Sequence, residues 1–472
     1  MVCRNRRWYK NNSTPLLFHR MVFRQHLRIA FTGNRAVCIP INKSNAEGAT
    51  GTVRGIYKGW VVAAVSFLSI GGSIGFAQYG FGLFIVPLQE EFGWTRTQIN
   101  FAITLGVLAH FVSPLIGRAI DIFGSRYVMA VSLGFIAVGF FLRSIMAELW
   151  QFYFFSLLVF TGTPGTGLTT GRLVQLWFPE TRGRMMGFVT AGNNFGGMVS
   201  IPVLTLVIAF GGWRSGFLFT AIFLGVLSIA SFIFVRDGIE FVLREQNKRW
   251  APRGLNQYSS KKVFDGLSVR SALLTRAFWF IATGMTLQQF VRTTLVTQLA
   301  AHLQDIQLSP DKIGLCLSVL AFGGVASKII FGRVSENTTA RWAYAMVVGI
   351  QVVGVAAFVF FSSDNFVLIF ISLSIFGLGM GGIGALGPLA VTELFGMKNY
   401  GTLNGLIRQG VIIPGIVGPL LAGAIYDSQG SYDLAFKIIL GFLFLSFLCF
   451  VSASPPARKE DFRDQRAVDS KL

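Results

Sequence analysis

The sequence predicts an all-α integral membrane protein of twelve transmembrane helices, arranged as two pseudo-symmetric bundles of six. Three observations lead to this prediction. The 472 residues are 53% hydrophobic and only 13% charged, whereas soluble domains carry about 25% charged residues. Apolar stretches long enough to cross a bilayer as helices, about 20 residues each, recur along the chain. A short charged motif between two such stretches occurs twice, once in each half.

The repeated motif connects two predicted helices in each half of the chain. Its first copy contains Gly117, Arg118, Asp121, Gly124 and Arg126. Its second copy has these residues at the matching positions: Gly332, Arg333, Glu336 and Arg341. Thr339 stands where a counterpart of Gly124 would fall. The repetition indicates that the chain is built from two related halves.

The predicted helices follow one another in a regular order. We expect the first six near residues 60–87, 97–118, 126–146, 150–177, 184–209 and 214–235. We expect the last six near residues 276–302, 311–332, 341–362, 365–391, 400–425 and 432–453. The resulting domains are a basic tail over 1–58, a bundle over 59–235, a linker over 236–275, a bundle over 276–453 and a tail over 454–472.

Basic residues are concentrated in the first tail, in the linker and in alternate loops. Loops rich in Lys and Arg remain in the cytoplasm, and an even number of spans places both termini on one side. We therefore expect a multi-pass plasma (inner) membrane protein with both termini cytoplasmic. The +20 net charge indicates tails close to anionic lipid rather than nucleic-acid binding. For 1–58 the sequence leaves open a disordered tail, an unused upstream start before Met21, or a transit peptide.

Enzymatic and cofactor functions have no support in the sequence. It contains no nucleophile–base arrangement and no phosphate-binding loop, and its four Cys have neither metal nor disulfide spacing. Gly377, Gly379 and Gly382 have the spacing of a dinucleotide fingerprint, but they lie inside an apolar span with no preceding strand. We interpret them as helix-packing glycines, and we expect neither an enzyme nor a bound cofactor or metal.

Charged side chains inside the spans are the main candidates for a functional site, because an ionisable group is costly at membrane depth. Four cations lie within predicted spans, namely Arg172, Arg292, Lys328 and Arg408, and no Asp or Glu lies mid-span. This excess of positive charge favours an anionic ligand such as a carboxylate. Arg292 and Arg408 fall in the middle of their spans. Arg172 and Lys328 fall nearer the cytoplasmic ends, within reach of the surface by snorkelling, so a functional role and a snorkelling role both stay open for them.

Uncharged polar residues could complete such a site. The candidates within the spans are Gln78, Tyr79, Asn193, Asn194, Gln289 and Asn404. Gln289 shares a helix face with Arg292, and Asn404 shares one with Arg408, because each pair is three or four residues apart. His110 is the only mid-span His, and two interpretations stay open: a proton relay, or a hydrogen-bonded packing residue.

Three stretches, together with the repeated motif, resemble the major facilitator superfamily. The first is Gly59-Trp60 followed by Tyr79–Phe84, the second is Trp177-Phe178 with Arg182-Gly183, and the third is Gly415–Asp427. The chain is most similar to the branch of monocarboxylate porters and oxalate/formate exchangers. The resemblance implies two six-helix halves that rock around a site near the bilayer midplane. It also implies that the Asp121 loop latches the cytoplasmic side.

The resemblance also bears on the candidate site. Lys328 falls where the porters carry a substrate-binding arginine, and Arg408 falls near a helix-11 lysine of the exchangers. Gly324 and Tyr79 replace an aspartate and a lysine that serve proton coupling in the porters, which leaves exchange or another proton carrier open.

The sequence therefore predicts a secondary active transporter of a small mono- or dicarboxylate, working by alternating access as an exchanger or a proton-coupled porter. Its expected partners are the lipid bilayer, a carboxylate substrate, and protons or a counter-anion. The alternatives are a drug-efflux facilitator, which would need mid-span acids, and a non-transporting sensor with the same fold.

Overall fold

The computed structural model describes residues 27–32, 35–40, 57–250, 266–361 and 365–455. The chain divides into two units, Met1–Ile56 and Tyr57–Leu472. In the first unit, β1 (Leu27–Thr32) pairs antiparallel with β2 (Arg35–Pro40). This hairpin lies inside the segment that the sequence predicted as a tail, and a pattern only six residues long is a weak strand signal. The rest of 1–56, and 456–472, lie outside the described residues.

The first half of the second unit forms six membrane spans. Its helical elements are α1 (Lys58–Ile74), η3 (Gly75–Tyr79), η4 (Gly80–Phe84), α2 (Ile85–Phe92), α3 (Arg96–Leu108), η5 (Ala109–Val112), α4 (Ser113–Phe123), α5 (Ser125–Ser144), α6 (Leu149–Trp177) and α7 (Arg182–Phe234). The first three form one span with α2, and α3, η5 and α4 form the second. Gly212, with φ of 71°, breaks α7 into two spans.

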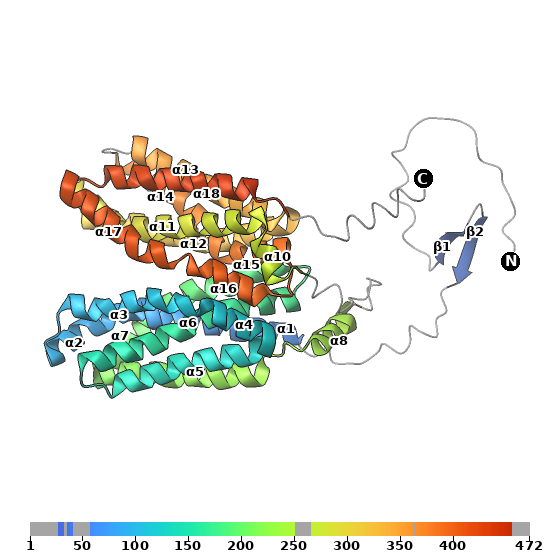
Figure 1. Cartoon of the computed structure of the whole chain (residues 1–472), viewed down its shortest axis with the longest axis horizontal. Helices are drawn as coiled ribbons and strands as arrows, with labels where there is room; N and C mark the ends of the chain where they lie inside the picture. The colour runs from blue at the N-terminus through green and yellow to red at the C-terminus, as the bar shows by residue number, and fades with distance from the viewer. Residues whose placement is uncertain (1–26, 33–34, 41–56, 251–265, 362–364, 456–472) are drawn as a thin grey trace. The chain divides into compact units, whose positions relative to one another are not determined.

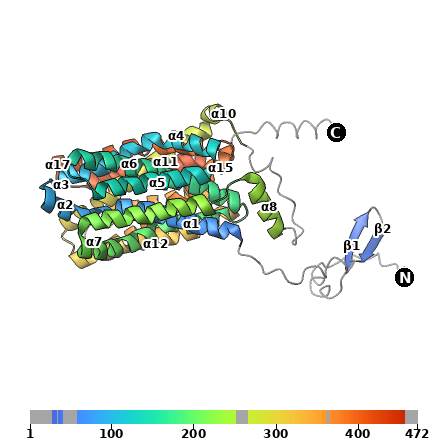
Figure 2. The ribbon, with the colours of Figure 1, turned by 90° about the horizontal axis from the view of Figure 1, so that it is seen from below.

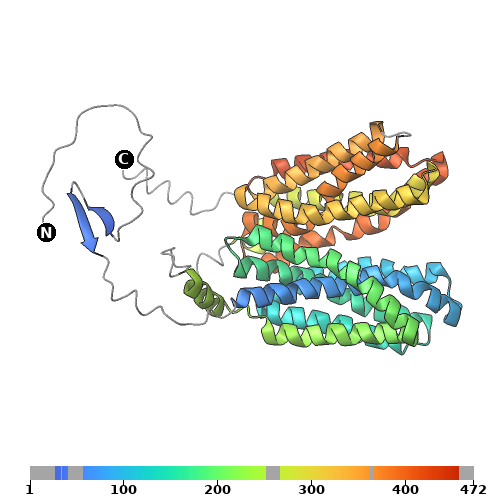
Figure 3. The same ribbon diagram turned by 180° about the vertical axis from the view of Figure 1, so that it is seen from behind.

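The second half repeats this arrangement. Its helices are α11 (Arg276–Asp305), α12 (Pro310–Asn337), α13 (Ala340–Phe361), α14 (Phe366–Met380), α15 (Gly382–Phe395), α16 (Tyr400–Gln409), α17 (Ile412–Gln429) and α18 (Asp433–Ser452). α14 with α15 forms one span, and α16 with α17 forms another. Figures 1 and 3 show this bundle, yellow to red, beside the first bundle, blue to green.

Length and hydropathy support a membrane location for these helices. Among the described residues, nine segments are long and apolar enough to cross a membrane, with the whole of α7 counted as one. α6 and α11 have 29 and 30 residues, but their Thr, Gly and Gln content lowers the hydropathy. With these two helices and the break at Gly212, the described chain has twelve spans in two bundles. The predicted fold class is confirmed.

The helix starts follow local capping rules. Thr95 and Gln98 form a capping box at the start of α3, and the Thr275 hydroxyl accepts from Phe278 N at the start of α11. Such bonds satisfy backbone N–H groups that have no partner in the first turn. Gly93 and Gly430 end α2 and α17 in the left-handed conformation, with φ of 68° and 67°, which glycine adopts without steric cost.

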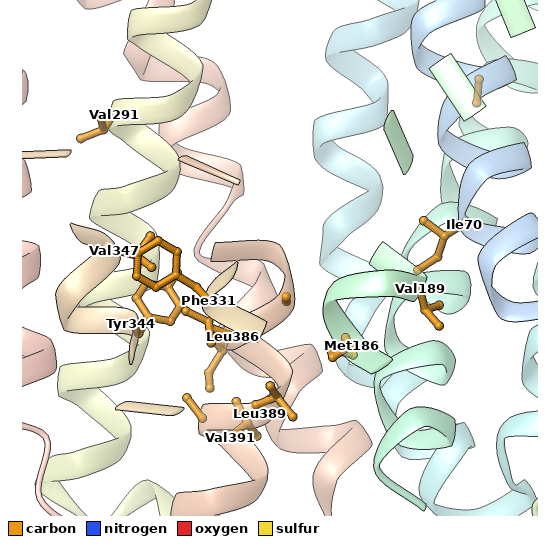
Figure 4. Packing of buried hydrophobic residues seen from close by; sticks show 14 of the residues in the cluster. Ile70, Met186, Val189, Val291, Phe331, Tyr344, Val347, Leu386, Leu389 and Val391 are labelled. Carbon is orange, nitrogen blue, oxygen red and sulfur yellow. The ribbon is translucent and has the colours of Figure 1, made fainter. Parts of the chain in front are cut away.

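Buried apolar side chains fill each bundle. Figure 4 shows Phe331, Tyr344, Val347 and Leu386 packed together within the second bundle, and Met186 and Val189 on α7 in the first. The ring of Tyr344 stacks on Phe450 of α18 with centroids 3.9 Å apart. Such contacts hold each bundle together as a unit, because lipid supplies no hydrophobic drive between helices.

The linker contacts both bundles at one end of the unit. Its helix α8 (Ile239–Trp250) lies near the start of α1 (Figure 2), and Gln246 Nε2 donates to Leu176 O at 2.7 Å. Before α10 (Val269–Leu273), Leu267 N donates to Phe395 O at 2.9 Å. We call this end, which carries the loops at 118–126, 178–184, 333–341 and 395–400, the charged-loop end.

Candidate functional site

Three of the spans that carry predicted site residues depart from α-helical geometry where those residues lie. Gln78 and Tyr79 are in the π-helical segment η3, and His110 is in the 3₁₀ segment η5. The eleventh span breaks at Gly410-Val411, two residues after Arg408. Irregular backbone at membrane depth occurs where it lines a cavity or is buried in protein, and broken helices mark the binding sites of many transporters.

The breaks of the second and eleventh spans face each other across the two bundles. A Cβ atom added at Gly117 would lie 2.0 Å from Gly401 O, and one added at Gly415 would lie 2.8 Å from Val107 Cγ1. Between these points, Gln409 Nε2 donates to Phe111 O at 3.2 Å. This antiparallel register places His110 opposite the Arg408–Gly410 segment.

Arg408 and Arg292 are cations at the interface between the bundles. A Cβ atom added at Gly167 would lie 3.4 Å from Arg408 Nη2, so this guanidinium extends to α6 of the first bundle. The charge of Arg292 acts on Arg408, on Lys328 and on His110 of the first bundle. The Arg292 side chain is exposed, and it lies close enough to residues of both bundles for its charge to act on them. Neither arginine has an ion pair with a described residue.

Lys328 is buried and does not snorkel to the surface, which leaves the functional one of its two interpretations open. It is 7% exposed, and its Nζ donates to Thr190 O at 3.1 Å and to Asn194 Oδ1. Both acceptors belong to α7 of the opposite bundle, because Gly187 allows the two backbones to approach closely at this point. Both acceptors are neutral, so the charge of Lys328 has no ion-pair partner among the residues described.

Arg172 is also buried, at 8% exposed, so it does not snorkel to the surface either. Its Nη1 donates to Ile120 O and lies 3.7 Å from Asp121 Oδ1. The reason is that α6 presents Arg172 to α4 inside the bundle rather than to the membrane surface. Unlike the other three cations, Arg172 has an acid beside it, so Arg292, Lys328 and Arg408 form the group we call the cation trio.

The uncharged candidates lie in different parts of the structure. The ring of Tyr79 packs near Gly197 of α7, and both Gln78 and Tyr79 are exposed. Asn193 Oδ1 is buried and has no hydrogen-bond partner among the described residues. Gln289 is half-buried and precedes Arg292 by three residues on α11, as expected.

Asn404 bonds a side chain that lies against α6, the helix that Arg408 also contacts. It is buried, and its Nδ2 donates to the Tyr400 hydroxyl at 2.9 Å. That hydroxyl lies close to Gly171 of α6, so Tyr400 joins the two bundles. Sequence reasoning did not identify Tyr400, or Thr190 beside Lys328, because an uncharged residue in an apolar span carries no signal of its partner.

The acid of the first motif crosses to the second bundle. Asp121 Oδ1 accepts from Gly401 N at 2.9 Å, and Oδ2 accepts from both the N and the Oγ1 of Thr402 at 2.8 Å. Gly401 and Thr402 form the first turn of α16, where backbone N–H groups lack helical partners and the helix dipole favours a negative charge. The Asp121 side chain is 8% exposed. We call this contact the Asp121 latch.

The acid of the second motif makes the equivalent crossing in the opposite direction. Glu336 Oε1 accepts from Arg184 N at 2.9 Å, and Oε2 accepts from Arg184 Nε at 2.7 Å. Arg184 lies in the first turn of α7, and a Cβ atom added at Gly183 would lie 2.0 Å from Gly332 O. We call this contact the Glu336 latch.

The remaining motif residues do not cross between the bundles. Gly124 has φ of 86° and precedes α5, whose N–H groups at Ser125 and Arg126 bond the carboxylate of Asp237. Arg126 Nε donates to Phe232 O at 2.6 Å within the first bundle. Arg118 and Arg333 are exposed. The motif therefore contributes its glycine and its acid to the interface, and its arginines lie elsewhere.

Among the described residues, the hydrogen bonds between the two bundles lie either at the depth of the cation trio or nearer the charged-loop end. The described residues make them at Asp121, Gln175, Lys328, Glu336 and Gln409. No described residue makes one in the half of the spans away from the charged-loop end. The bundles are therefore joined at the charged-loop end, and we call this arrangement the closed state.

Comparisons with known proteins agree with this architecture. The family model of the Major Facilitator Superfamily matches residues 67–291 and 281–470. The chain is 23% identical over 411 residues to the oxalate:formate antiporter of Oxalobacter formigenes, covering 86% of this chain and 93% of that protein. It is 24% identical over 419 residues to monocarboxylate transporter 10 of Rattus norvegicus, covering 83% of this chain and 78% of the relative.

Solved structures share the fold. A double Trp mutant of XylE superposes with a TM-score of 0.69 at 13% identity, covering 85% of this chain and 97% of that one. The human organic anion transporter MFSD10 superposes with a TM-score of 0.61 at 16% identity, covering 83% and 99%. The twelve spans, the paired latches and the family match over most of the chain lead to one conclusion. The chain belongs to the major facilitator superfamily of secondary membrane transporters.

Proposed function

We propose that this transporter moves a small organic anion with one or two carboxylates by alternating access, as an exchanger or together with a proton. The cation trio is the observation that carries the proposal. Arg292, Lys328 and Arg408 have no acid within ion-pair distance among the described residues. Charges inside a membrane protein are costly unless they are paired. A carboxylate bound between the bundles would supply the missing negative charge.

The geometry of the trio suits a carboxylate in particular. The Arg408 guanidinium presents a planar fork of donors to the interface, and such forks bind both oxygens of a carboxylate at once. Lys328 already donates to Asn194 and Thr190 of α7. A second carboxylate could replace these neutral acceptors. This would extend the substrates from mono- to dicarboxylates.

The named relatives support this substrate class. They are the oxalate:formate antiporter, the monocarboxylate transporters and a hexuronate transporter of Bacillus subtilis, which is 22% identical over 414 residues. Each carries an acid, according to its name. The feature of this chain that fits such cargo is the trio itself.

The two latches define the conformational step. Rocking of the bundles towards the alternate state must break both the Asp121 latch and the Glu336 latch, since each joins one bundle to the other. We propose that the charged-loop end lies on the cytoplasmic side of the plasma (inner) membrane, because this end carries the basic loops. The described state would then receive substrate from outside.

His110 would serve the proton-coupled mode. It lies opposite the Arg408–Gly410 segment, and its Nδ1 is 3.3 Å from Gly106 O. The described residues around the trio include no Asp or Glu within ion-pair distance. If protons accompany the anion, His110 is an ionisable group beside the site that is available to carry one. In the exchange mode it would only pack against the backbone.

Uptake of radiolabelled lactate, pyruvate, formate and oxalate into proteoliposomes tests the proposal. We expect saturable uptake by the wild type and a loss of at least about tenfold in Arg408→Gln, because a charge-assisted contact contributes roughly 1.5–3 kcal/mol. Arg408→Lys should retain part of the activity. Arg270→Gln, which removes an exposed arginine of α10, is the matched control and should transport normally.

The opposite result is equally clear. If none of the four anions is carried, and Arg408→Gln shows the same ligand-induced thermal shift as the wild type, then the trio is not an anion site. An external pH step in the same vesicles, with wild type compared to His110→Gln, separates exchange from proton coupling.

A further inference from the structure

A cavity lies at the end of the C-terminal bundle away from the charged-loop end. Its volume is about 350 Å³, which is within the range of small-ligand sites. It is enclosed by the ends of α11, α13, α14 and α18, all of which belong to one bundle (Figure 1). It shares no residue with the cation trio. Its lining includes His302, Asp305, Phe358, Tyr432, Asp433, Phe436 and Lys437.

The ionisable groups of this cavity are not paired with one another. Asp305, at the end of α11, and Asp433, at the start of α18, are exposed and have no ion pair among the described residues. Lys437 is also exposed and has none. Two carboxylates against one ammonium give the cavity an excess of negative charge when His302 is neutral. It therefore attracts cations, in contrast to the central site.

Aromatic rings form another wall. The ring of His302 lies edge-on to Phe436, Phe358 and Tyr432, with centroids 4.9, 5.6 and 6.1 Å apart. Aromatic faces attract organic cations, and the attraction grows when the cation is partly removed from water. Rings next to carboxylates are the combination that suits an ammonium group with an apolar part.

Tyr432 adds a polar side chain to the lining of this cavity. Tyr432 is only 7% exposed and its ring stacks on Tyr426 with centroids 4.5 Å apart. Its hydroxyl has no hydrogen-bond partner in the part of the chain that the structure describes. Burial, followed by the charge of Asp305, raises the pKa of Tyr432. The hydroxyl therefore stays protonated, and its oxygen is left free to accept a hydrogen bond from a ligand.

We propose that this cavity is a binding site for a small organic ammonium compound, held by Asp305 and Asp433 and packed against Tyr432 and Phe436. A bound ammonium would connect the end of α11 to the start of α18. A metal ion is a poorer fit, because the described residues contain no group of three His, Cys, Asp or Glu side chains arranged to hold one. The site is separate from the proposed anion site and stands whether or not the chain carries carboxylates.

Calorimetric titration of the full chain in nanodiscs with choline chloride tests the proposal. Choline keeps its charge at every pH, and sodium chloride at equal concentration controls for ionic strength. We expect saturable binding that weakens roughly fivefold in Asp305→Asn and in Asp433→Asn, the scale of a partly exposed ionic contact. Asp311→Asn is the matched control, because Asp311 is an exposed acid at the same end of the bundle that does not line the cavity.

Two further variants make the outcomes decisive. Arg408→Gln should bind choline as the wild type does, because it alters only the central site. Folding of each variant is checked by its thermal unfolding midpoint. The proposal is overturned if choline has no more effect than sodium chloride, or if both aspartate variants bind it normally. It is also overturned if acetate binds here instead and Lys437→Gln abolishes that binding, since the cavity would then be an anion site.

Discussion

The two latches at the charged-loop end follow one plan but differ in their surroundings. In each, a glycine brings two helix backbones together, and an acid four residues later accepts from backbone N–H in the first turn of a helix of the opposite bundle. Asp121 is 8% exposed and has Arg172 behind it. In the Glu336 latch, the Arg184 side chain is 47% exposed. The acid itself, Glu336, is 12% exposed, so water and salt reach the second latch through Arg184 and reach the first latch less.

This difference indicates that the two latches share their geometry but contribute unequal free energies to the closed state. A buried carboxylate that accepts several hydrogen bonds is costly to release, because its charge and its partners would be left unsatisfied. An exposed ion pair contributes about 1 kcal/mol or less. The Asp121 latch should thus determine most of the stability of the closed state, whereas the Glu336 latch adjusts it.

The glycine contacts should show the largest effect and no asymmetry. A Cβ atom at Gly117 or at Gly183 would lie 2.0 Å from a backbone carbonyl of the other bundle, which no side-chain rotation can relieve. We expect Gly117→Ala and Gly183→Ala each to disfavour the closed state by ~3 kcal/mol. Spin labels at the exposed positions Phe123 and Thr338 would report a longer distance.

Gly225→Ala serves as the control for the glycine variants, because a Cβ atom there would make only an ordinary contact of 4.0 Å. Replacing glycine by alanine also raises helix propensity, but this gain stabilises the closed and the alternate state equally. It therefore does not change the equilibrium between them. A normal closed distance in Gly117→Ala would show that the close approach of α4 and α16 is not required for closure.

Asp121→Asn should have the next largest effect. The amide keeps one acceptor oxygen but loses the charge that faces the α16 N-terminus and Arg172, so we expect a loss of about 2 kcal/mol from the closed state. The same pair of labels measures it. Asp237→Asn is the matched control, since that carboxylate also bonds helix N–H groups but within a single bundle. Equal shifts in the two variants would contradict the assignment of Asp121 to closure.

Glu336→Gln should have the smallest effect, below about 1 kcal/mol, because its partner is exposed. The Glu336 latch of the wild type should also be the latch that depends on salt. Raising the ionic strength screens exposed charges more than buried ones, so salt should weaken closure in the wild type and have little effect in Glu336→Gln. A larger effect of Glu336→Gln than of Asp121→Asn would reverse the comparison.

The sequence by itself determined the class of the protein, the number of spans and the residues worth testing. Long apolar runs report the membrane, since only helices satisfy their backbone there. The cost of charge at membrane depth singled out four cations, Arg172, Arg292, Lys328 and Arg408, without any knowledge of their neighbours. The repeated motif marked Asp121 and Glu336 as counterparts. These signals are local or repeated, and a single chain displays them in full.

Only the tertiary structure decided which residues meet. Arg172 and Lys328 occupy similar depths, yet one lies beside Asp121 and the other bonds Asn194 and Thr190. Asn404 donates to the hydroxyl of Tyr400, a partner that its spacing from Arg408 did not reveal. The breaks at η3, η5 and Gly410 likewise left no sequence signal that we recognised. The physical reason is that hydropathy reports whether a helix contacts lipid, whereas the partner of a buried polar group depends on which helix packs against it.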